Sequence, residues 1–330
     1  MAVLVTGAGG YLGSLVAERY RAAGEEVVGH GRATGDLAGD EPFAGIDPGR
    51  ITHIVHSAAL TRFDVSREDA RAVNVDGTRK LLAFATRCPR LEAIGFVSTV
   101  YATGLRAGPI EERLYDDGPG FANTYEWSKW EAERLVAASE LPWRILRVAT
   151  VVADDDSGRV TQHNAFHETL KLWFGGLLPL VPGHGATPLY LVTGDFVSSA
   201  IVSLTEAGAG VYHLTHARNC TLVELLDVVA GAFEEVDSFR RRRVLPPLLG
   251  DRETFDLLAS GVEAFGGGLV RQSLQSVVPF ARQLFVAKDV DNRRLRAALG
   301  DRYQAPDPAE LVRRACRHLV ESKWGRVAVG

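Results

Sequence analysis

Cysteine is scarce in this chain of 330 residues, and long apolar runs are missing. The three cysteines, Cys88, Cys220 and Cys316, are widely separated and odd in number, so they form neither a disulfide framework nor the ligand spacing of a metal site. No window reaches the length of a membrane span without charge or proline, and the first apolar run, residues 2–5, is too short for the core of a secretory leader. We therefore expect a cytoplasmic protein with no membrane span and no metal site.

An excess of charge of either sign is also missing. The 37 Lys and Arg residues nearly balance the 41 Asp and Glu residues, which leaves a formal net charge of −4. Such a chain has no overall attraction for nucleic acid or for an anionic membrane surface. Apolar residues (46%) and charged residues (24%) occur in ordinary globular proportion, which excludes a disordered or fibrous chain. A small molecule is therefore the expected partner.

Short apolar runs alternate with longer amphipathic stretches through the first half of the chain. The strand candidates are residues 3–5, 27–28, 51–55, 94–97 and 143–148, and the helix candidates are residues 66–86 and 124–139. Strands of this length separated by helices are typical of βαβ units. The pattern predicts an α/β fold, a Rossmann-type doubly wound parallel sheet.

The pattern changes after Val152. An acidic loop at 153–158 precedes a helix candidate at 164–174, and the chain from about residue 221 is mostly helical, interrupted by a glycine run at 266–268. We expect a nucleotide-binding domain at 1–160 and a smaller, mostly helical C-terminal substrate lobe at 161–330. Within that lobe, residues 189–215 are expected to return to the main sheet.

The segment TGAGGYLG, residues 6–13, turns directly from a strand into a helix. A dinucleotide-binding turn uses three glycines: Gly7 for the tight turn, Gly10 for close approach to the pyrophosphate, and Gly13 for close packing of helix on strand. The start of the helix then offers free N–H groups to the phosphates. We therefore predict that Gly7, Gly10, Tyr11, Leu12 and Gly13 bind a dinucleotide.

The end of the second strand lacks the acidic residue with which NAD-selective sites hold the ribose hydroxyls. Residues 27–32 read VVGHGR, and the guanidinium of Arg32 can pair with a 2′-phosphate. The sequence therefore predicts NADP(H) as the cofactor. A solvated Arg32 is the alternative interpretation, and His30 is a secondary candidate.

Two further segments are candidates for contact with the cofactor. Asp36 and Leu37 could lie beside the adenine, although Asp36 is also an ordinary turn residue. Ser57, Ala58 and Ala59 follow the strand at 51–55 and are small enough for the cofactor to lie against them.

Tyr125 and Lys129 are four residues apart in a predicted helix, so both side chains lie on one face. A phenol is a poor acid or base at neutral pH, but a neighbouring ammonium favours the phenolate and lowers its pKa. Thr99 follows the strand at 94–97 and emerges at the carboxyl edge of the sheet, where such folds bind ligands. Its hydroxyl could hold a substrate oxygen against Tyr125 during hydride transfer.

Four motifs together resemble the extended short-chain dehydrogenase/reductase family: TGAGGYLG at 6–13, NVDGT at 74–78, STVY at 98–101 and YEWSK at 125–129. The resemblance implies that Tyr125 is the general acid/base, that Lys129 activates it and bridges to the cofactor ribose, and that Thr99 contacts the substrate oxygen. It also implies a structural or proton-relay role for Asn74. Ser98 is the alternative to Thr99 if the register differs by one.

Within this family, NTYEWSKWEAE at 123–133 and DSGR at 156–159 resemble the thioester-reductase and fatty-acyl reductase branch. The match is partial, because Val148 replaces the usual proline of that branch. The resemblance implies an NADPH-dependent reductase of a carbonyl substrate, an acyl thioester, aldehyde or ketone, presented free, on coenzyme A or on a carrier protein. A homodimer is common in the family.

Three other functions remain open at this point. One is a dehydrogenase of ketones or secondary alcohols with a steroid-like or polyketide-like substrate. Nucleotide-sugar epimerisation is less favoured, because the asparagine that usually follows the strand at 143–148 is missing. The third is a non-catalytic NADP-sensing regulator, against which Tyr125 and Lys129 argue.

Several other groups of residues allow two interpretations. The apolar residues Phe166, Leu170, Trp173, Phe174, Leu177 and Leu178 either line a substrate tunnel or form a buried helix face. The arginine run at 240–243 either meets a phosphate or acidic partner or is a solvated basic face. His163 and His167 have the spacing of a metal pair but no third ligand nearby, and the acidic run at 154–156 is expected to be a solvated loop.

Overall fold

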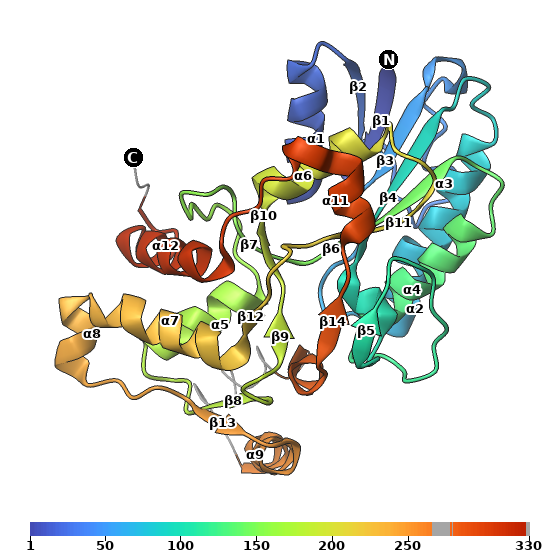
Figure 1. The fold of residues 1–330 in the computed structure, drawn as a ribbon. Coiled ribbons are helices and arrows are strands. Elements are labelled where there is room, and N and C mark those ends of the chain that lie inside the picture. The colour runs from blue at the N-terminus through green and yellow to red at the C-terminus, as the bar shows by residue number, and fades with distance from the viewer. Residues whose placement is uncertain (266–277, 279, 328–330) are drawn as a thin grey trace.

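The computed structural model describes residues 1–265, 278 and 280–327. The glycine run at 266–268 lies outside these residues. The centre of the molecule is a parallel sheet of six strands in the order β11-β6-β4-β3-β1-β2 (Figure 1). Its strands are β1 (Ala2–Thr6), β2 (Glu26–His30), β3 (His53–His56), β4 (Ala93–Thr99), β6 (Trp143–Val148) and β11 (Gly210–Leu214). The predicted doubly wound Rossmann-type fold is confirmed.

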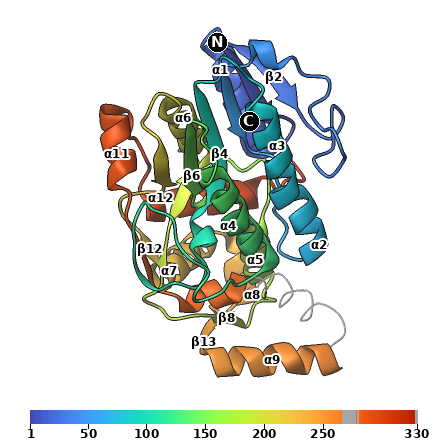
Figure 2. The same ribbon diagram turned by 90° about the vertical axis from the view of Figure 1, so that its right-hand side faces the viewer.

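Helices cover both faces of this sheet. One face carries α1 (Tyr11–Ala22), α6 (Gly194–Leu204) and α11 (Arg293–Leu299). The other face carries α2 (Arg67–Ala70), the π-helical segment η2 (Arg71–Asp76), α3 (Gly77–Ala85) and α4 (Thr124–Ala137). Figure 2 shows α6 and α3 on opposite sides of β4.

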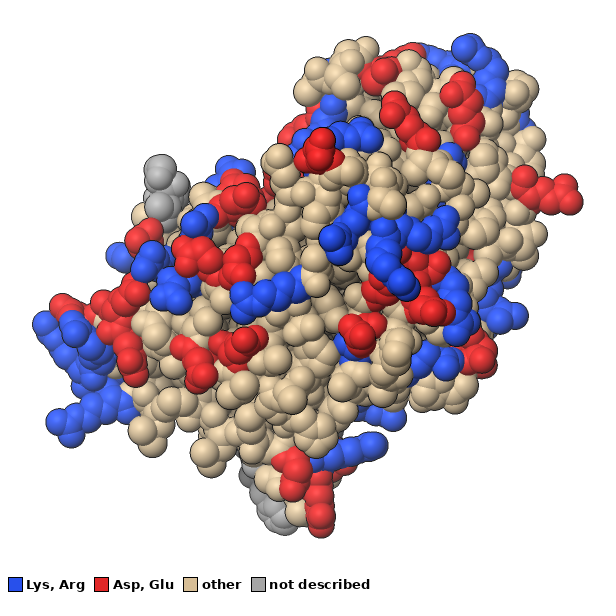
Figure 3. Space-filling view, viewed as in Figure 1, with Lys and Arg blue, Asp and Glu red and all other residues tan. Residues whose placement is uncertain are grey.

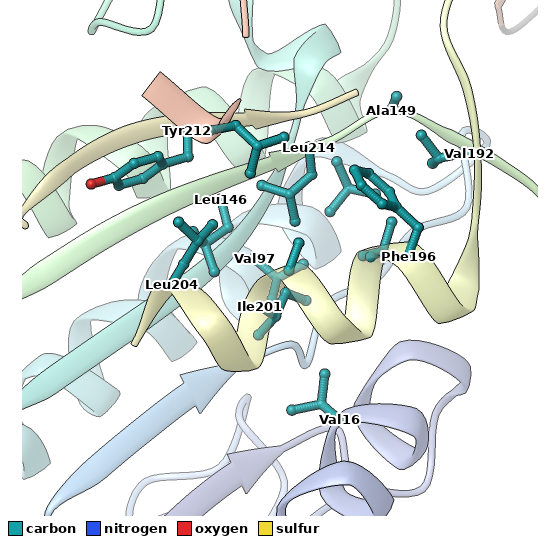
Figure 4. Close-up of a cluster of buried hydrophobic side chains, with 14 of the residues drawn as sticks. Val16, Val97, Leu146, Ala149, Val192, Phe196, Ile201, Leu204, Tyr212 and Leu214 are labelled. Atoms are coloured by element: carbon teal, nitrogen blue, oxygen red, sulfur yellow. The ribbon is translucent and has the colours of Figure 1, made fainter. Parts of the chain in front are cut away.

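Alternating strand residues explain how one sheet packs against both layers. Val3 and Val5 of β1 are buried with α1 and α6, whereas Leu4 between them is buried with α3. Figure 4 shows the α6 layer, where Val97 and Leu146 of the sheet lie near Ile201. Each fully buried side chain of this size contributes roughly 1.5–3 kcal/mol to stability.

A second, mostly helical region lies beyond the carboxyl ends of the strands (Figure 1). It contains α5 (Ala165–Phe174), α7 (Leu222–Glu234), α8 (Asp237–Arg242), α9 (Arg252–Phe265) and α12 (Pro308–Glu321). Four two-stranded pairs accompany these helices: β7 (Thr150–Ala153) with β10 (Leu191–Thr193), β8 (Leu180–Pro182) with β13 (Leu248–Gly250), β9 (Pro188–Leu189) with β12 (Cys220–Thr221), and β5 (Gly108–Ile110) with β14 (Lys288–Val290). None of the helices among the described residues is long and apolar enough to cross a membrane.

Both regions are assembled from separate stretches of chain. α6 and β11 belong to the main sheet and its cover, and α11 returns to the same layer near the end of the chain. α12 then crosses back to pack on α7 in the helical region. The division of the chain near residue 160 stays a prediction, and in space residues 194–214 lie with the sheet. Short 3₁₀ turns complete the chain: η1 (Pro48–Arg50), η3 (Val100–Thr103), η4 (Arg282–Phe285) and η5 (Gly300–Arg302).

Candidate active site

The glycine loop joins β1 to α1 in a turn that only glycine fits. Gly7 has a φ of +70°, and a Cβ atom there would lie 2.8 Å from the backbone nitrogen of Ala58. A Cβ atom at Gly13 would lie 2.0 Å from the carbonyl oxygen of Gly7. Gly10 is the N-cap of α1 and makes no side-chain cap hydrogen bond, so the first N–H groups of the helix stay available for a phosphate.

The end of β2 presents Arg32 to solvent. Arg32 is exposed and forms no ion pair or hydrogen bond with the described part of the chain. His30 instead points inward: its Nε2 lies 2.9 Å from the carbonyl oxygen of Pro42, and its ring packs 4.8 Å from that of Phe43. We therefore drop His30 as a phosphate ligand and retain Arg32.

The segments after β2 and β3 flank the glycine loop. Asp36 is exposed and accepts a hydrogen bond from the N–H of Ala38 at 3.0 Å, as a turn residue does. Leu37 is buried against Gly77, which keeps this loop on α3. Ala58 donates its N–H to Thr6 Oγ1 at 3.2 Å, so the predicted cofactor-facing stretch Ser57, Ala58 and Ala59 is fixed beside the loop.

Tyr125 and Lys129 lie on α4, which begins where the side chain of Asn123 accepts the N–H of Glu126 at 3.0 Å. The Lys129 ammonium is buried, 4.1 Å from the centre of the Phe96 ring, and burial lowers its pKa to about 7. Tyr125 is partly exposed, and its hydroxyl has no hydrogen-bond partner among the described residues. Burial, followed by the carboxylates of Glu126 and Glu133, raises the Tyr125 pKa. A positive charge beside the Tyr125 hydroxyl would lower this pKa, because it stabilises the phenolate.

Ser98 and Thr99 end β4 and have different surroundings. The Ser98 hydroxyl is buried and donates to Glu133 Oε1 at 2.6 Å. Thr99 Oγ1 accepts the N–H of Tyr101 at 3.3 Å, which leaves its proton free to be donated elsewhere. The contacts therefore favour Thr99 over Ser98 as the hydroxyl available to a substrate.

Asn74 lies in η2, a π-helical turn of the kind often found at functional sites. Its Nδ2 donates to the carbonyl oxygen of Leu60 at 3.0 Å and to Ser128 Oγ at 2.8 Å, and its Oδ1 accepts the N–H of Leu60 at 2.7 Å. Asn74 thus joins the segment after β3 to α4. These contacts favour the structural role over the proton relay.

The amino-acid sequence is similar to a known protein family and to several known proteins. Residues 48–201 match the model of the male sterility protein family. A dTDP-4-dehydrorhamnose reductase of Mycolicibacterium smegmatis is 26% identical over 280 residues, which are 80% of each chain. A fatty acyl-CoA reductase of Drosophila melanogaster is 27% identical over 46% of this chain, which spans only 33% of that relative's length. The chain is thus similar to the extended short-chain dehydrogenase/reductases, in sequence over residues 48–201 and in fold over its whole length.

Solved structures agree on the fold. The terminal R domain of the myxalamid PKS-NRPS pathway has a TM-score of 0.76 at 23% identity, with 99% of this chain and 92% of that chain covered. A UDP-glucose 4-epimerase of Thermus thermophilus in complex with NAD has a TM-score of 0.65 at 20% identity, covering 97% and 99% of the two chains. These solved structures show the fold, and the family model together with the relatives indicates an oxidoreductase.

Sequence reasoning missed a contact between the glycine loop and the helical region. The Tyr11 hydroxyl donates to Asp154 Oδ1 at 2.8 Å, and a Cβ atom at Gly194 would lie only 2.4 Å from that hydroxyl. Asp154 is buried, so the expectation that residues 154–156 form a solvated loop is wrong for it, although Asp156 is exposed. Burial and the Asp154 carboxylate raise the Tyr11 pKa. The two residues line a pocket of about 50 Å³ with Asn164.

A buried ion pair behind α4 was also missed. Arg147 Nη2 lies 2.7 Å from Glu133 Oε2, and the two side chains are 0% and 1% exposed. Arg147 further donates to the carbonyl oxygen of Arg113 at 3.0 Å and to His213 Nε2 at 3.2 Å. Together with Ser98, this pair forms a polar network that crosses β4, β6 and β11 beneath α4.

The remaining candidates at 163–178 belong to the helical region. Leu170, Trp173 and Leu178 are buried in the core of the helical region, with Phe166 and Phe174 packed against it, so the buried-face interpretation is correct for them. Leu177 is partly exposed. The ring of His167 is used by backbone groups, because Nδ1 accepts the N–H of Asn164 and Nε2 lies 3.0 Å from the carbonyl oxygen of Val152.

The arginine run at 240–243 lies on and just after α8. All four arginines are exposed, and Figure 3 shows basic side chains at the left edge of the molecule, where α8 lies. Arg240 pairs with Asp237, and Arg242 lies 4.9 Å from the ring centre of Phe174. These contacts are those of a basic face of a short helix.

Proposed function

We propose that this oxidoreductase is an NADPH-dependent reductase that transfers hydride to a carbonyl group of an acyl-type substrate, a thioester, an aldehyde or a ketone. The observation that carries the proposal is the position of Tyr125, whose hydroxyl has no partner within the described part of the chain and lies on the same helix as the buried Lys129. When the carbon of a carbonyl group accepts a hydride, its oxygen must receive a proton, and the Tyr125 hydroxyl can donate it.

Each residue has a task in this proposal. Bound NADPH supplies the hydride. Tyr125 donates the proton to the carbonyl oxygen, and Thr99 donates a hydrogen bond to the same oxygen. In its protonated form Lys129 would place a positive charge near Tyr125 and so favour the phenolate that proton donation leaves. Asn74 keeps α4 and the segment after β3 in place through Ser128 and Leu60.

The residues at the glycine loop fit an NADP(H) molecule. Gly7, Gly10 and Gly13 create the tight turn, and the backbone of Tyr11 and Leu12 offers N–H groups at the start of α1. Arg32 would pair with the 2′-phosphate, and this exposed guanidinium has no competing carboxylate among the described residues. Asp36, Leu37 and the stretch 57–59 would border the adenosine.

An acyl substrate is supported by the surroundings of Tyr125 and by the relatives. The Phe63 ring lies 6.0 Å from the Tyr125 ring and 6.5 Å from the Phe280 ring, which gives the hydroxyl an apolar border. Fatty acyl-CoA reductases and an R domain of a PKS-NRPS pathway are among the proteins similar to this chain. We therefore propose that coenzyme A or a carrier protein presents the thioester.

The test is NADPH oxidation with a panel of acyl-CoA thioesters, aldehydes and ketones, and NADP+ reduction with secondary alcohols. We expect Tyr125→Phe to lower kcat by about 10²–10⁴-fold, the usual contribution of a general acid. Tyr212→Phe is the matched control, since the Tyr212 hydroxyl bonds to the carbonyl oxygen of Gly208 at the far end of β11. Unchanged turnover in Tyr125→Phe would overturn the mechanism.

Ketone reduction on a nucleotide sugar is the second candidate. It is favoured by one observation, the similarity to a dTDP-4-dehydrorhamnose reductase over 80% of both chains. Adding a dTDP-4-keto-sugar to the panel separates the two candidates. Turnover of this compound, with none of the acyl substrates, would favour the second.

A further inference from the structure

The residue directly after Tyr125 is a buried carboxylate. Glu126 is 2% exposed, and its Oε2 accepts hydrogen bonds from the N–H of Ala122 at 2.9 Å and from Gln283 Nε2 at 2.8 Å. Its Oε1 accepts Asn123 Nδ2 at 3.2 Å. A glutamate at the third helical position usually bonds back to the N-cap backbone. Glu126 instead reaches a residue 157 positions further along the chain.

Gln283 belongs to a C-terminal segment that lies against the start of α4. The segment comprises η4 and β14, and β14 pairs with β5 through Lys288 opposite Gly108. Lys288 is buried and donates from Nζ to the carbonyl oxygens of Gly104 and Arg106, the latter at 3.0 Å. Gln283 therefore has little freedom to leave Glu126.

The same segment touches Tyr125 by a second route. Phe280, just before η4, packs against Phe63, and Phe63 packs against the Tyr125 ring. This part of the chain thus contacts the start of α4 directly through Gln283 and reaches the Tyr125 ring indirectly through Phe63. Removing the polar pair would leave the position of Tyr125 to the weaker aromatic contact.

We propose that Glu126 is a positioning residue of the active site, which holds the first turn of α4, and with it Tyr125, against the C-terminal segment through Gln283. This inference rests on the proposed role of Tyr125. A carboxylate is costly to bury unless it is hydrogen-bonded, so an anchor is the role that its three donors support. Burial raises the Glu126 pKa to about 7, and Gln283, Lys288 and the N–H of Ala122 oppose the rise.

The test compares Glu126→Ala, Glu126→Gln and Gln283→Leu, with decanoyl-CoA and decanal as substrates. Glu126→Ala should lower kcat by about 10–100-fold, as misplacement of a reacting group by 1 Å does. KM and the dissociation constant for NADPH should change less than about twofold, since no substrate or cofactor contact is removed. Glu126→Gln keeps an acceptor for Ala122 and should retain most of the activity.

Two further variants sharpen the result. Gln283→Leu should reproduce part of the loss, and the double variant Glu126→Ala/Gln283→Leu should lose no more than Glu126→Ala, because both changes break one contact. Glu131→Gln is the control, since Glu131 lies on the same helix and makes no hydrogen bond or ion pair with the described residues.

Hydrogen exchange gives a readout that needs no turnover. The amides of residues 126–128, which are hydrogen-bonded in the first turn of α4, should lose protection in Glu126→Ala and in Gln283→Leu but not in Glu131→Gln. Wild-type kcat and wild-type protection in Glu126→Ala would overturn the positioning role. If Tyr125→Phe keeps full activity, the proposed mechanism fails; if only Tyr125→Phe loses activity, the positioning role alone fails.

Discussion

The ion pair between Arg147 and Glu133 gives the sharpest prediction of stability. Both side chains are fully buried, and Glu133 also accepts the Ser98 hydroxyl. Glu133→Met removes the carboxylate but leaves the guanidinium inside the protein, where the acceptors that remain among the described residues are the carbonyl oxygen of Arg113 and the neutral ring of His213. The His213 pKa is lowered by burial to about 3, so this ring carries no charge near neutral pH.

The expected loss follows from the uncompensated charge. Breaking a buried pair by removing one partner costs about 3–5 kcal/mol, so the free energy of unfolding of Glu133→Met should fall by that amount. At roughly 2–4 °C per kcal/mol for larger domains, Tm should fall by roughly 10 °C. Glu133→Met/Arg147→Met removes both charges, and apolar replacement of a whole pair is often neutral. The double variant should therefore be the more stable of the two.

Urea unfolding followed by circular dichroism and tryptophan fluorescence measures this difference. Glu235→Ala serves as the control, because its pair with Arg317 is about half exposed (48% for each side chain) and such pairs contribute about 1 kcal/mol or less. The reasoning is refuted if Glu133→Met loses no more than Glu235→Ala. It is refuted equally if the double variant is less stable than Glu133→Met.

Three other predictions concern the glycine loop, Arg32 and α4. Gly13→Ala should abolish NADPH binding in a fluorescence titration, because the added Cβ atom would lie 2.0 Å from the carbonyl oxygen of Gly7. The control Gly231→Ala should bind NADPH normally, because an added Cβ atom there has open space around it. Arg32→Ala should weaken the binding of NADPH about 10–100-fold and leave the binding of NADH unchanged, since a charge-assisted hydrogen bond contributes about 1.5–3 kcal/mol. Equal weakening for both cofactors would contradict the pairing of Arg32 with the 2′-phosphate. The pKa of Lys129 is about 7 in the folded protein and about 10 in the unfolded chain, so between pH 7 and 9 the unfolded chain binds more protons. The free energy of unfolding of the wild type should therefore rise over this range relative to that of Lys129→Met, as urea titrations at each pH would measure. A flat difference would show that Lys129 stays charged.

Local patterns made the fold and the glycine loop predictable. The alternation of short apolar runs with amphipathic stretches is a property of neighbouring residues, and the predicted strands correspond to β1, β2, β3, β4 and β6, whereas the short strand β5 was not predicted. The tight turn at Gly7 is equally local. The orientation of His30 was not, because its inward position depends on Pro42 and Phe43 in a loop with no regular spacing.

Contacts between distant segments could not be predicted in the same way. Tyr11 and Asp154 are 143 residues apart, and Glu126 and Gln283 are 157 apart. Nothing in the spacing of either pair indicates that the two residues meet. The apolar helix at 164–174 shows the same limit: periodicity predicts a buried face, but only the position of α7 and α12 decides that the face meets a core rather than a tunnel.

One face of α4 carries both a locally predictable pair of residues and a residue that contacts a distant strand. Tyr125, Lys129 and Glu133 follow at intervals of four, so they share one helix face, and their burial increases from the partly exposed Tyr125 to the fully buried Glu133. The Glu133 carboxylate raises the pKa values of both Tyr125 and Lys129. It thereby supports a charged Lys129 but opposes a phenolate at Tyr125. Arg147, paired with the far side of that carboxylate, reduces its field at Tyr125, which is eight residues away, so the buried pair acts on the proposed chemistry as well as on stability.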